Sequence, residues 1–572
     1  MQYRLVNENF KDNYGENLLK ARGVSDIKGF LNPTKEFLQD SSYLDNIQAG
    51  AEIFLDVIMN KQPILIIVDS DVDGFTSAAI IYQYIVDNFP NANIQYRLHT
   101  GKQHGLEDHI EDIIQDEWGL IICPDSSSND FEYHEKLSCP VLVLDHHELD
   151  CEVSKNAIII NNQTSNEYLN KDLTGAGVVY QFCRYIDTKV PQYIKSNSYN
   201  YIDLAALGIC GDMGSMIQPE NRYICYTGFN QVKNPFFKAI LEKQSYSTGG
   251  KVNPMTVAFY VVPMINAMIR TGTMEEKTRL FEAFIHGNEM IPSGKRGAKG
   301  TLERAAVESV RECTNARSHQ NKILDKNVEK FEDRIFKYDL LENRILFVRL
   351  EEEDDLPSEL NGLLAMKLAA KYKKPTIVAR LNPEGFDRGS IRNVNNCALT
   401  DLKEFLTNSG YFEYVQGHAN AAGCSIADKD LRAFHEYANE ALKDIDFGEG
   451  VYDVNFVRAA ADKDIEKLIF DLAQYEDTWG QNNPEALIYV HDLNITKEEC
   501  QILGKNSDTL KINKFGISYM KFFAKDLIQQ LKEMDKIKIN LVGKTNVNVW
   551  AGTCTPQIFI EAYELEDDTY GF

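Results

Sequence analysis

The sequence predicts a multidomain α/β protein with a mostly parallel sheet in its N-terminal half and a small β-barrel at its C-terminus. The chain has 572 residues, which is long enough for several domains with their own cores. Residues 46–235 alternate apolar strand patterns with helical patterns, and this alternation predicts a parallel sheet covered on both faces. Residues 446–572 contain several short strand patterns separated by turns, which is typical of a small barrel.

The composition is that of a globular protein, with 44% hydrophobic residues and a formal net charge of −25. This acidity argues against non-specific wrapping of nucleic acid, but a local basic groove or bound metal ions would still allow a nucleic-acid enzyme. The eleven cysteines form no CxxC pair, which favours reduced thiols in the cytoplasm over disulfides or a zinc site. No apolar run approaches the length of a membrane span, so we expect no membrane contact.

Residues 1–45 predict a mixed, mainly helical lead-in that packs against the domain after it. The first strand of that domain, Ile64–Val68, is five apolar residues in a row, which predicts burial on both faces. Phe75–Val86 then predicts a helix. Between strand and helix stand three aspartates at alternate positions: Asp69, Asp71 and Asp73. Carboxylates crowded at a buried strand end are costly unless cations such as Mg²⁺ or Mn²⁺ neutralise them, and the alternative is an acidic turn without a metal.

Four later segments repeat the pattern of an apolar run followed by a polar residue. The predicted strands are 120–123, 141–144, 157–160 and Leu204–Cys210, and after them come Asp125, Asp145-His146-His147, Asn161 and Asp212. Ligands of open parallel sheets gather outside the carboxyl ends of the strands, so we expect a site there. Two Mn²⁺ or Mg²⁺ ions, with one carboxylate shared between them, could be held by Asp69, Asp71, Asp73, Asp125, His146 and Asp212. Two such ions together activate water and stabilise an in-line phosphoryl displacement.

The Asp145-His146-His147 segment contains the catalytic candidates. His146 is the one imidazole in the predicted ligand set, and Asp145 is better placed as a partner that orients a histidine. His147 could contact phosphate or take part in proton transfer. The alternative is a polar strand end without a catalytic role.

These segments resemble the four motifs of the DHH phosphoesterase superfamily, and within it those of the RecJ-type single-strand-specific exonucleases. The resemblance covers Asp69–Gly74, the Asp125 strand end, Asp145–His147 and Gly211-Asp212. Gly101–Leu106 and Thr174–Gly177 also resemble segments that the group has in the same order. The resemblance implies a DHH-type parallel-sheet catalytic domain with metal ligands at the six positions named above.

The resemblance extends over nearly the whole chain. Residues 236–338 are similar to a helical connector, in which Arg270 is a candidate phosphate contact and Met264 stands where the family has an arginine. Residues 339–445, with predicted strands 345–350 and 376–381, are similar to the DHH-associated α/β domain. Two of its motifs, each with glycine for close backbone approach, imply that the substrate phosphate is bound by Arg388, Ser390, Arg392, Gly417 and His418.

Residues 446–572 are similar to the family's oligonucleotide-binding (OB) barrel. Such barrels bind single strands by aromatic stacking and a basic groove. The stacking candidates are Tyr519, Phe522, Phe523 and above all Trp550, and the phosphate candidates are Lys511, Lys514, Lys521 and Lys544. The alternative for each aromatic residue is a place in the barrel core.

The sequence therefore predicts a RecJ-like exonuclease that uses two Mn²⁺ or Mg²⁺ ions to hydrolyse single-stranded DNA. Family resemblance implies 5′ to 3′ polarity, release of 5′-mononucleotides, and a role in DNA repair, recombination or replication. We expect a monomer. A single-strand-binding protein or a helicase is a candidate partner. Two alternatives stay open, namely a phosphodiesterase for short oligonucleotides or cyclic dinucleotides, and a non-catalytic single-strand-binding scaffold.

Overall fold

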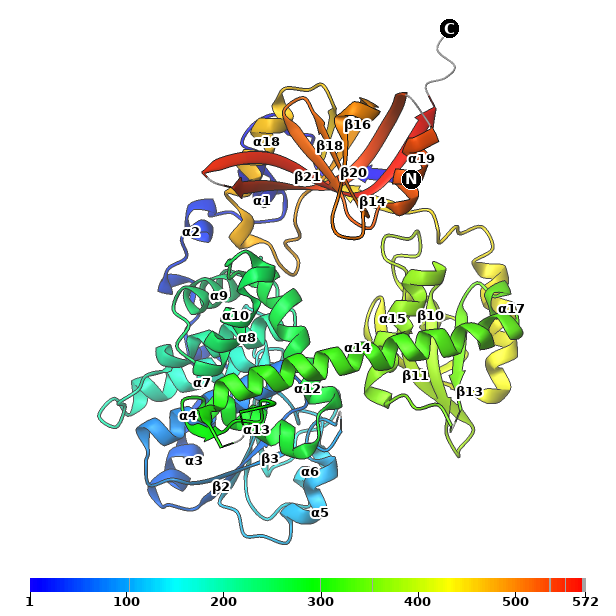
Figure 1. The fold of residues 1–572 in the computed structure, drawn as a ribbon. Helices are drawn as coiled ribbons and strands as arrows, with labels where there is room; N and C mark the ends of the chain where they lie inside the picture. Colours follow the sequence, from blue (N-terminus) through cyan, green and yellow to red (C-terminus); the bar gives the residue numbers. More distant parts are fainter. Residues whose placement is uncertain (102, 299, 352, 534–535, 551, 568–572) are drawn as a thin grey trace. The chain divides into compact units, whose positions relative to one another are not determined.

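The computed structural model describes residues 1–572 except 102, 299, 352, 534–535, 551 and 568–572 (Figure 1). The chain forms two compact units. Unit A comprises Arg22–Gln320 with Asp477–Pro484, and unit B comprises Met1–Ala21, Asn321–Glu476 and Glu485–Phe572. The predicted lead-in of residues 1–45 is thus divided between the two units after residue 21.

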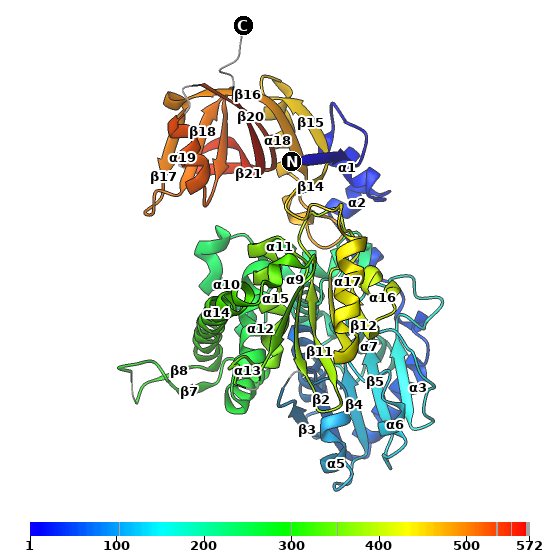
Figure 2. The same ribbon diagram turned by 90° about the vertical axis from the view of Figure 1, so that its right-hand side faces the viewer.

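Unit A is built around a five-stranded sheet whose neighbouring strands are all parallel (Figure 2). The strand order is β3-β2-β4-β5-β6. This confirms the predicted parallel sheet, although β3 was not foreseen. The strands are β2 (Pro63–Val68), β3 (Asn93–Leu98), β4 (Leu120–Pro124), β5 (Val141–Asp145) and β6 (Ala157–Asn161).

In β2 and the three strands on one side of it (β4, β5 and β6), alternate side chains enter two different cores. Ile64 and Ile66 pack with α3 (Ile47–Met59), α4 (Val72–Asn88) and α7 (Gly175–Lys189), whereas Leu65 and Ile67 pack with α5 (Ile110–Ile113). Helices therefore cover both faces, and the polar strand ends are left at the edge. Further helices of unit A are α2 (Ile27–Leu31), α6 (Phe131–His134), α9 (Pro219–Asn230), α10 (Pro235–Thr248), α11 (Pro254–Thr256), α12 (Val262–Thr271) and α13 (Met274–His286).

One segment that was predicted as a strand at the site is a helix. Leu204–Cys210, predicted as a strand, belongs to the helix α8 (Ile202–Gly211), so that prediction is wrong. A short apolar run does not distinguish a buried strand from a buried helix by its periodicity. Here the run includes Ala205 and Ala206, and alanine is the strongest helix former. All the residues from Ile202 to Cys210 are buried because α4, α7 and α9 surround the helix.

The predicted helical connector of residues 236–338 contains the long helix α14 (Ala305–Lys337), and a short hairpin of β7 (Met290–Pro292) and β8 (Leu302–Arg304) precedes it. Unit B contains a sheet in the order β12-β13-β11-β10-β9. Its strands are β9 (Leu346–Leu350), β10 (Thr376–Leu381), β11 (Phe386–Arg392), β12 (Phe412–His418) and β13 (Ala421–Ala427), and its helices are α15 (Asn361–Tyr372), α16 (Leu402–Asn408) and α17 (Leu431–Ala441).

The C-terminal part of unit B is one seven-stranded sheet of curved strands in the order β15-β16-β20-β21-β19-β18-β17 (Figure 1). Two of the short strand patterns in this region, over 536–542 and 546–550, prove to be a single strand with a register shift at Val542/Gly543. The elements are β15 (Phe456–Ala459), α18 (Asp464–Ala473), β16 (Leu487–Thr496), β17 (Cys500–Leu503), β18 (Thr509–Lys514), β19 (Ile517–Lys521), α19 (Lys525–Glu533), β20 (Lys536–Trp550) and β21 (Thr553–Asp567).

The N-terminal residues belong to the same unit as this sheet. β1 (Gln2–Leu5) pairs in parallel with β14 (Val451–Val454), and α1 (Tyr14–Ala21) packs on α18. Nothing in the local sequence of residues 2–5 identifies a partner some 450 residues away along the chain. In the described part of the chain, no helix combines the length and the apolar character needed to cross a membrane.

Candidate metal centre

Unit A gathers the predicted metal ligands at the carboxyl end of its sheet. Asp69 follows β2, Asp125 follows β4, and His146 follows β5. Asp71 caps the N-terminus of α4 by accepting a hydrogen bond from the Gly74 backbone N–H at 3.0 Å, which places Asp73 in the first turn. Asp212 caps the C-terminus of α8, so it reaches the site from a helix end and not from a strand end.

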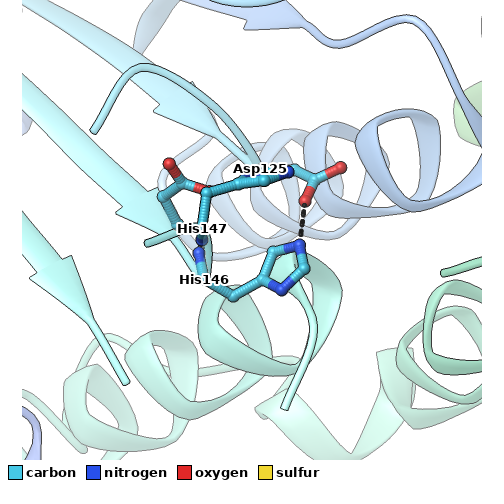
Figure 3. A group of neighbouring side chains, drawn as sticks. Asp125, His146 and His147 are labelled. Carbon is cyan, nitrogen blue, oxygen red and sulfur yellow. Dashed lines mark hydrogen bonds and ion pairs between the residues drawn. The ribbon is translucent and has the colours of Figure 1, made fainter. Parts of the chain in front are cut away.

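These six residues form two adjacent donor groups. The ligand atoms of Asp69, Asp71 and Asp125 lie within 4.8 Å of one another, and so do those of Asp73, His146 and Asp212. His146 links the groups, because its Nε2 lies 3.2 Å from Oδ1 of Asp125 (Figure 3) and 3.5 Å from Oδ2 of Asp212. Carboxylate oxygens with a few imidazole nitrogens suit Mn²⁺ and Mg²⁺.

Burial makes this site unfavourable for carboxylates alone. The exposed fractions of Asp69, Asp73 and Asp125 are only 1–2%. Burial raises the pKa of Asp69 to about 6, against the hydrogen bond from His104. Burial and the charges of Asp212 and Asp71 raise the pKa of Asp73 to about 8. The pKa of Asp125 is also raised well above its usual range, first by burial and then by the neighbouring carboxylates.

Two buried oxygens of the site have no hydrogen-bond partner among the residues that the structure describes. They are Oδ1 of Asp69 and Oδ1 of Asp125. The 3.2 Å approach of His146 to Asp125 is within ion-pair range but does not have the alignment of a hydrogen bond. Buried oxygens without partners are costly unless a cation or another donor meets them. The residues present therefore fit divalent cations.

The N-terminus of α7 holds Asp73 in place. Its carboxylate accepts hydrogen bonds from Oγ1 of Thr174 at 3.0 Å and from the backbone N–H groups of Gly175 at 2.7 Å and Ala176 at 3.0 Å. The partial positive charge of a helix N-terminus favours a carboxylate there. A side chain on Gly175 would collide with Asp125, since its Cβ would lie 2.3 Å from Oδ1. The Thr174–Gly177 segment thus packs directly against two candidate ligands.

Asp145 has a different role from the other aspartates. It accepts hydrogen bonds from Nδ1 of His147 at 2.7 Å and from the backbone N–H groups of His146 at 2.7 Å and Ser128 at 3.1 Å. Burial would raise its pKa, but these hydrogen bonds and the nearby histidines outweigh burial and hold the pKa well below its usual range. The hydrogen bond to Asp145 raises the pKa of His147 to about 9, although burial opposes it. His147 is therefore a cation at neutral pH.

Arg270 lies close to this site, on α12. Burial lowers its pKa, and the charge of the nearby Asp71 acts in the opposite direction. Met264, on the same helix, is buried and has Nε2 of Gln244 against its sulfur, so it contributes to the core. The charge of Arg317 on α14 also acts on Arg270.

The structure adds two histidines that the sequence did not single out. Nδ1 of His104 lies 2.6 Å from Oδ2 of Asp69. His99, the residue directly after β3, has its Nε2 4.0 Å from Oδ1 of Asp69. His104 lies within the segment Gly101–Leu106, which resembles a family segment but has no assigned role. His99 was missed because β3 itself was not predicted.

The predicted phosphate ligands of unit B lie on neighbouring strands of one sheet. Arg388, Ser390 and Arg392 are alternate residues of β11, so their side chains share one face. Arg392 pairs across with Ala421 of β13, which in turn pairs with His418 of β12. Residues directly opposite one another point to the same face, so we define Arg388, Ser390, Arg392 and His418 as the phosphate row. Gly417 is next to this row and has φ +127°, a conformation that only glycine adopts without strain.

The predicted stacking residues of the C-terminal sheet differ in exposure. Trp550 is 78% exposed, Phe523 89% and Phe522 49%, whereas Tyr519 is fully buried and belongs to the core. Three of the predicted phosphate lysines already have protein partners. Lys514 pairs with Glu499 at 2.5 Å, Lys544 with Glu485 at 3.1 Å, and Lys521 donates to the backbone carbonyl of Glu561 at 2.9 Å.

A parallel sheet with these acidic and histidine-bearing ends defines a phosphoesterase of the DHH type, and comparisons with known proteins agree. Residues 63–209 match the DHH family, N-terminal domain, and residues 461–562 match the RecJ OB domain. The chain is 38% identical over 578 residues to the "Putative SPbeta prophage-derived single-strand DNA-specific exonuclease YorK" of Bacillus subtilis (strain 168), covering 99% of this chain and 98% of that protein. The chain therefore belongs to the RecJ-like exonucleases of the DHH family.

More distant relatives share the fold. The single-stranded-DNA-specific exonuclease RecJ of Bacillus subtilis (strain 168) is 22% identical over 568 residues, which cover 95% of this chain and 67% of that protein. The crystal structure of RecJ in complex with Mn²⁺ from Thermus thermophilus has a TM-score of 0.73 at 16% identity, covering 98% of this chain and 79% of that one. This likeness confirms the α/β architecture with its C-terminal OB domain.

Proposed function

We propose that this chain hydrolyses phosphodiester bonds of single-stranded DNA from the 5′ end, using two Mn²⁺ or Mg²⁺ ions and releasing 5′-mononucleotides. The observation that supports it most directly is the pair of adjacent donor groups, Asp69/Asp71/Asp125 and Asp73/His146/Asp212. Asp125 is the candidate for the shared carboxylate, because its Oδ1 also lies 3.2 Å from His146 of the second group. The substrate class, single-stranded DNA, comes from the relatives, which are named as exonucleases specific for it.

Two divalent ions, when bound, supply activation of water and stabilisation of the charge that develops in an in-line phosphoryl displacement. The side chains of unit A would hold and orient the reactants around them. Asp145 fixes the ring of His147, whose positive charge makes it a donor to a phosphate oxygen. Arg270, which lies within the electrostatic influence of Asp71, is a second cation for the phosphate. The buried surroundings strengthen each of these charge interactions.

The phosphate row of unit B is the proposed substrate-binding surface. Each of its two arginines carries a planar guanidinium fork that matches the oxygens of one phosphate, which a lysine ammonium does not. The exposed ring of Trp550 is the proposed stacking platform for a base. Within this proposal the parts of the chain are a lead-in (1–45), a catalytic domain (46–235), a helical connector (236–338), a substrate-binding domain (339–445) and an OB domain (446–572).

The proposal also covers the setting of the enzyme. All eleven cysteines are free thiols, nine of them at least half-buried, which suits a reducing cytoplasm. We infer a monomer that takes single strands from a single-strand-binding protein or a helicase. Sedimentation of the purified chain tests the first inference, and stimulation of digestion by each partner tests the second.

The experiment that tests the function is a time course on 5′-labelled and 3′-labelled single strands, with a duplex control, in Mn²⁺, Mg²⁺ and chelator. We expect immediate release of labelled mononucleotide from the 5′ end, only with metal and only from single strands. Early release from the 3′ label would contradict the polarity. Survival of long strands while a dinucleotide is cleaved would identify a small-substrate phosphodiesterase. Metal binding without any cleavage would identify a binding scaffold.

A further inference from the structure

We propose that His99 is a further metal ligand, which binds beside Asp69 the ion of the first donor group. The inference rests on the metal centre of the proposed function and names a ligand that the sequence motifs do not contain. It follows from the register of two strands, from two buried atoms without partners, and from the hydrogen bonds that orient His99 and Asp69.

The register of β2 and β3 brings His99 to the metal centre. Val68 and Leu98, the last residues of the two strands, are paired in a parallel ladder. Asp69 and His99 are therefore the first residues beyond the sheet on adjacent strands. Their side chains meet, with Nε2 of His99 4.0 Å from Oδ1 of Asp69. His99 thus stands at the same carboxyl edge as Asp69, Asp125 and His146.

Neither of these two facing atoms has a hydrogen-bond partner among the described residues. Both are deeply buried, since His99 is 2% exposed and Asp69 is 1% exposed. A buried nitrogen and a buried oxygen that face each other without a hydrogen bond are costly unless something lies between them. Metal–ligand bonds are about 2.1 Å long, so one ion can bridge donors up to about 4.2 Å apart.

Hydrogen bonds at the far side of each residue orient both donors. Nδ1 of His99 lies 2.7 Å from Oδ1 of Asp108, which belongs to the short 3-10 helix Glu107–His109. This carboxylate favours the proton on Nδ1. The Nε2 lone pair then points to Asp69. His104 occupies Oδ2 of Asp69 and leaves Oδ1 available. A histidine anchored by a carboxylate through one ring nitrogen, with the other nitrogen free, is the usual arrangement of a metal-bound histidine.

The neutral form of His99 is the form that binds a metal. Because Nδ1 lies against the carboxylate of Asp108, the lone pair of Nε2 is the one left for a metal ion. With His99, each of the two donor groups contains one imidazole, His99 in the first and His146 in the second. Imidazole nitrogen favours Mn²⁺ over Mg²⁺, so the inference predicts a preference for Mn²⁺ at both positions.

Pulsed electron paramagnetic resonance of the Mn²⁺-loaded full chain tests this directly, because a coordinated nitrogen splits the Mn²⁺ signal. We expect nitrogen couplings from two imidazoles in the wild type and from one in His146→Gln, since His99 remains. We expect one coupling in His99→Gln and none in the double variant. His109→Gln is the matched control, since its ring packs on His99 at 4.6 Å between centroids and its Nε2 lies 3.8 Å from Oδ1 of Asp108.

Titration with Mn²⁺ and Mg²⁺ gives a second readout. His99→Gln should weaken Mn²⁺ binding at one position by at least about tenfold and should reduce the preference for Mn²⁺ over Mg²⁺. The His109→Gln variant should bind both ions as the wild type does. Circular dichroism checks that each variant is folded. If His99→Gln does not fold, the absence of any nitrogen coupling in His146→Gln would still refute the role of His99.

The outcomes separate this inference from the proposed function. A wild-type chain that binds no Mn²⁺ would overturn both. Two-ion binding with no nitrogen coupling left in His146→Gln would refute the role of His99 and leave the metal centre intact; a water molecule would then bridge His99 and Asp69. Retention of one coupling in His146→Gln, and its loss in the double variant, would establish His99 as the ligand.

Discussion

The metal centre of unit A and the phosphate row of unit B both concern phosphate chemistry, but they are built in opposite ways. The first collects negative charge where water is excluded, with Asp69, Asp73 and Asp125 almost fully buried. The second places positive charge on a strand face that water reaches, with Arg388 and His418 exposed. We therefore expect the buried site of unit A to depend on added cations and the exposed row of unit B not to depend on them.

A buried carboxylate cluster is unfavourable until cations neutralise it, so the folded metal centre requires bound cations to be stable. A solvated guanidinium needs no such partner and meets phosphate by hydrogen bonds and charge alone. We therefore expect variants of unit A to affect turnover and metal binding, and variants of unit B to affect substrate affinity. The following predictions test that division, starting with the largest expected effect.

Replacing a buried ligand should nearly abolish turnover. Asp125→Asn removes one charge from both donor groups, and the loss of several kcal/mol of charge stabilisation corresponds to at least about a 10³-fold lower kcat. Asn tolerates the left-handed backbone of this residue, φ +67°, so the fold should persist. Single-turnover kinetics with a saturating single strand measure the effect. A variant with more than a tenth of wild-type activity would show that Asp125 is not a ligand.

Removing a guanidinium from the phosphate row should weaken substrate binding without affecting the metal centre. Arg392→Ala should raise KM for single strands by about 10- to 100-fold, the equivalent of a hydrogen bond to a charged group, while Mn²⁺ affinity stays unchanged. Arg432→Ala is the matched control, because that arginine lies on α17 of the same unit and its side chain is 91% exposed. Equal kinetics of the two variants would argue against the row.

A smaller change at the same place should give a smaller effect. Gly362 lies in the first turn of α15, and a Cβ added there would come 2.5 Å from Nη2 of Arg392. Gly362→Ala should therefore displace the guanidinium and raise KM less than Arg392→Ala does. The double variant should be no worse than Arg392→Ala alone, because both changes act through one side chain. Additive effects would place the role of Gly362 elsewhere.

The exposed aromatic ring should contribute less than the phosphate row. Trp550→Ala removes a base-stacking platform, and a loss of about 1 kcal/mol corresponds to roughly fivefold weaker binding of a single strand. Fluorescence anisotropy with a labelled oligonucleotide in chelator measures this without cleavage. Tyr246→Ala is the control, since that ring is 98% exposed on α10. Unchanged affinity in Trp550→Ala would exclude a stacking role.

The last prediction concerns the stability of the metal-free protein. Folding raises the pKa of Asp125, so its contribution to stability is present below the pKa of the unfolded chain, about 4, and is lost as the pH rises above it. Asn cannot ionise. In chelator, Asp125→Asn should therefore melt a few degrees above the wild type, by a margin that grows from about pH 5 to pH 8. Saturating Mn²⁺ should reverse the order, and a constant margin at all pH values would contradict the raised pKa.

Local sequence patterns determined much of this protein. The apolar runs of β2, β4 and β5 could be recognised because strands buried on both faces are continuously hydrophobic. The polar residues after them converge in any parallel sheet, so the metal centre followed from composition and chain order. The sheet of residues 339–445 and the OB domain were likewise anticipated from strand patterns and motif resemblance.

Other features depend on contacts between distant residues, which no local pattern specifies. The run Leu204–Cys210 forms a helix that three other helices surround, although its apolar character alone also suits a strand. β3 is an edge strand with alternating exposure, so it lacks the hydrophobic run that revealed its neighbours, and His99 went unnoticed with it.

The sequence by itself determined which residues could bind metal and phosphate, because residue type and strand periodicity are local properties. Only the tertiary structure decided which of them meet. Strand register brings His99 to Asp69, and it aligns Arg392 with His418 across β13. Tertiary packing likewise separates the buried Tyr519 from the exposed Trp550. The physical reason is that register and burial are set by the packing of the whole domain, which the local sequence does not contain.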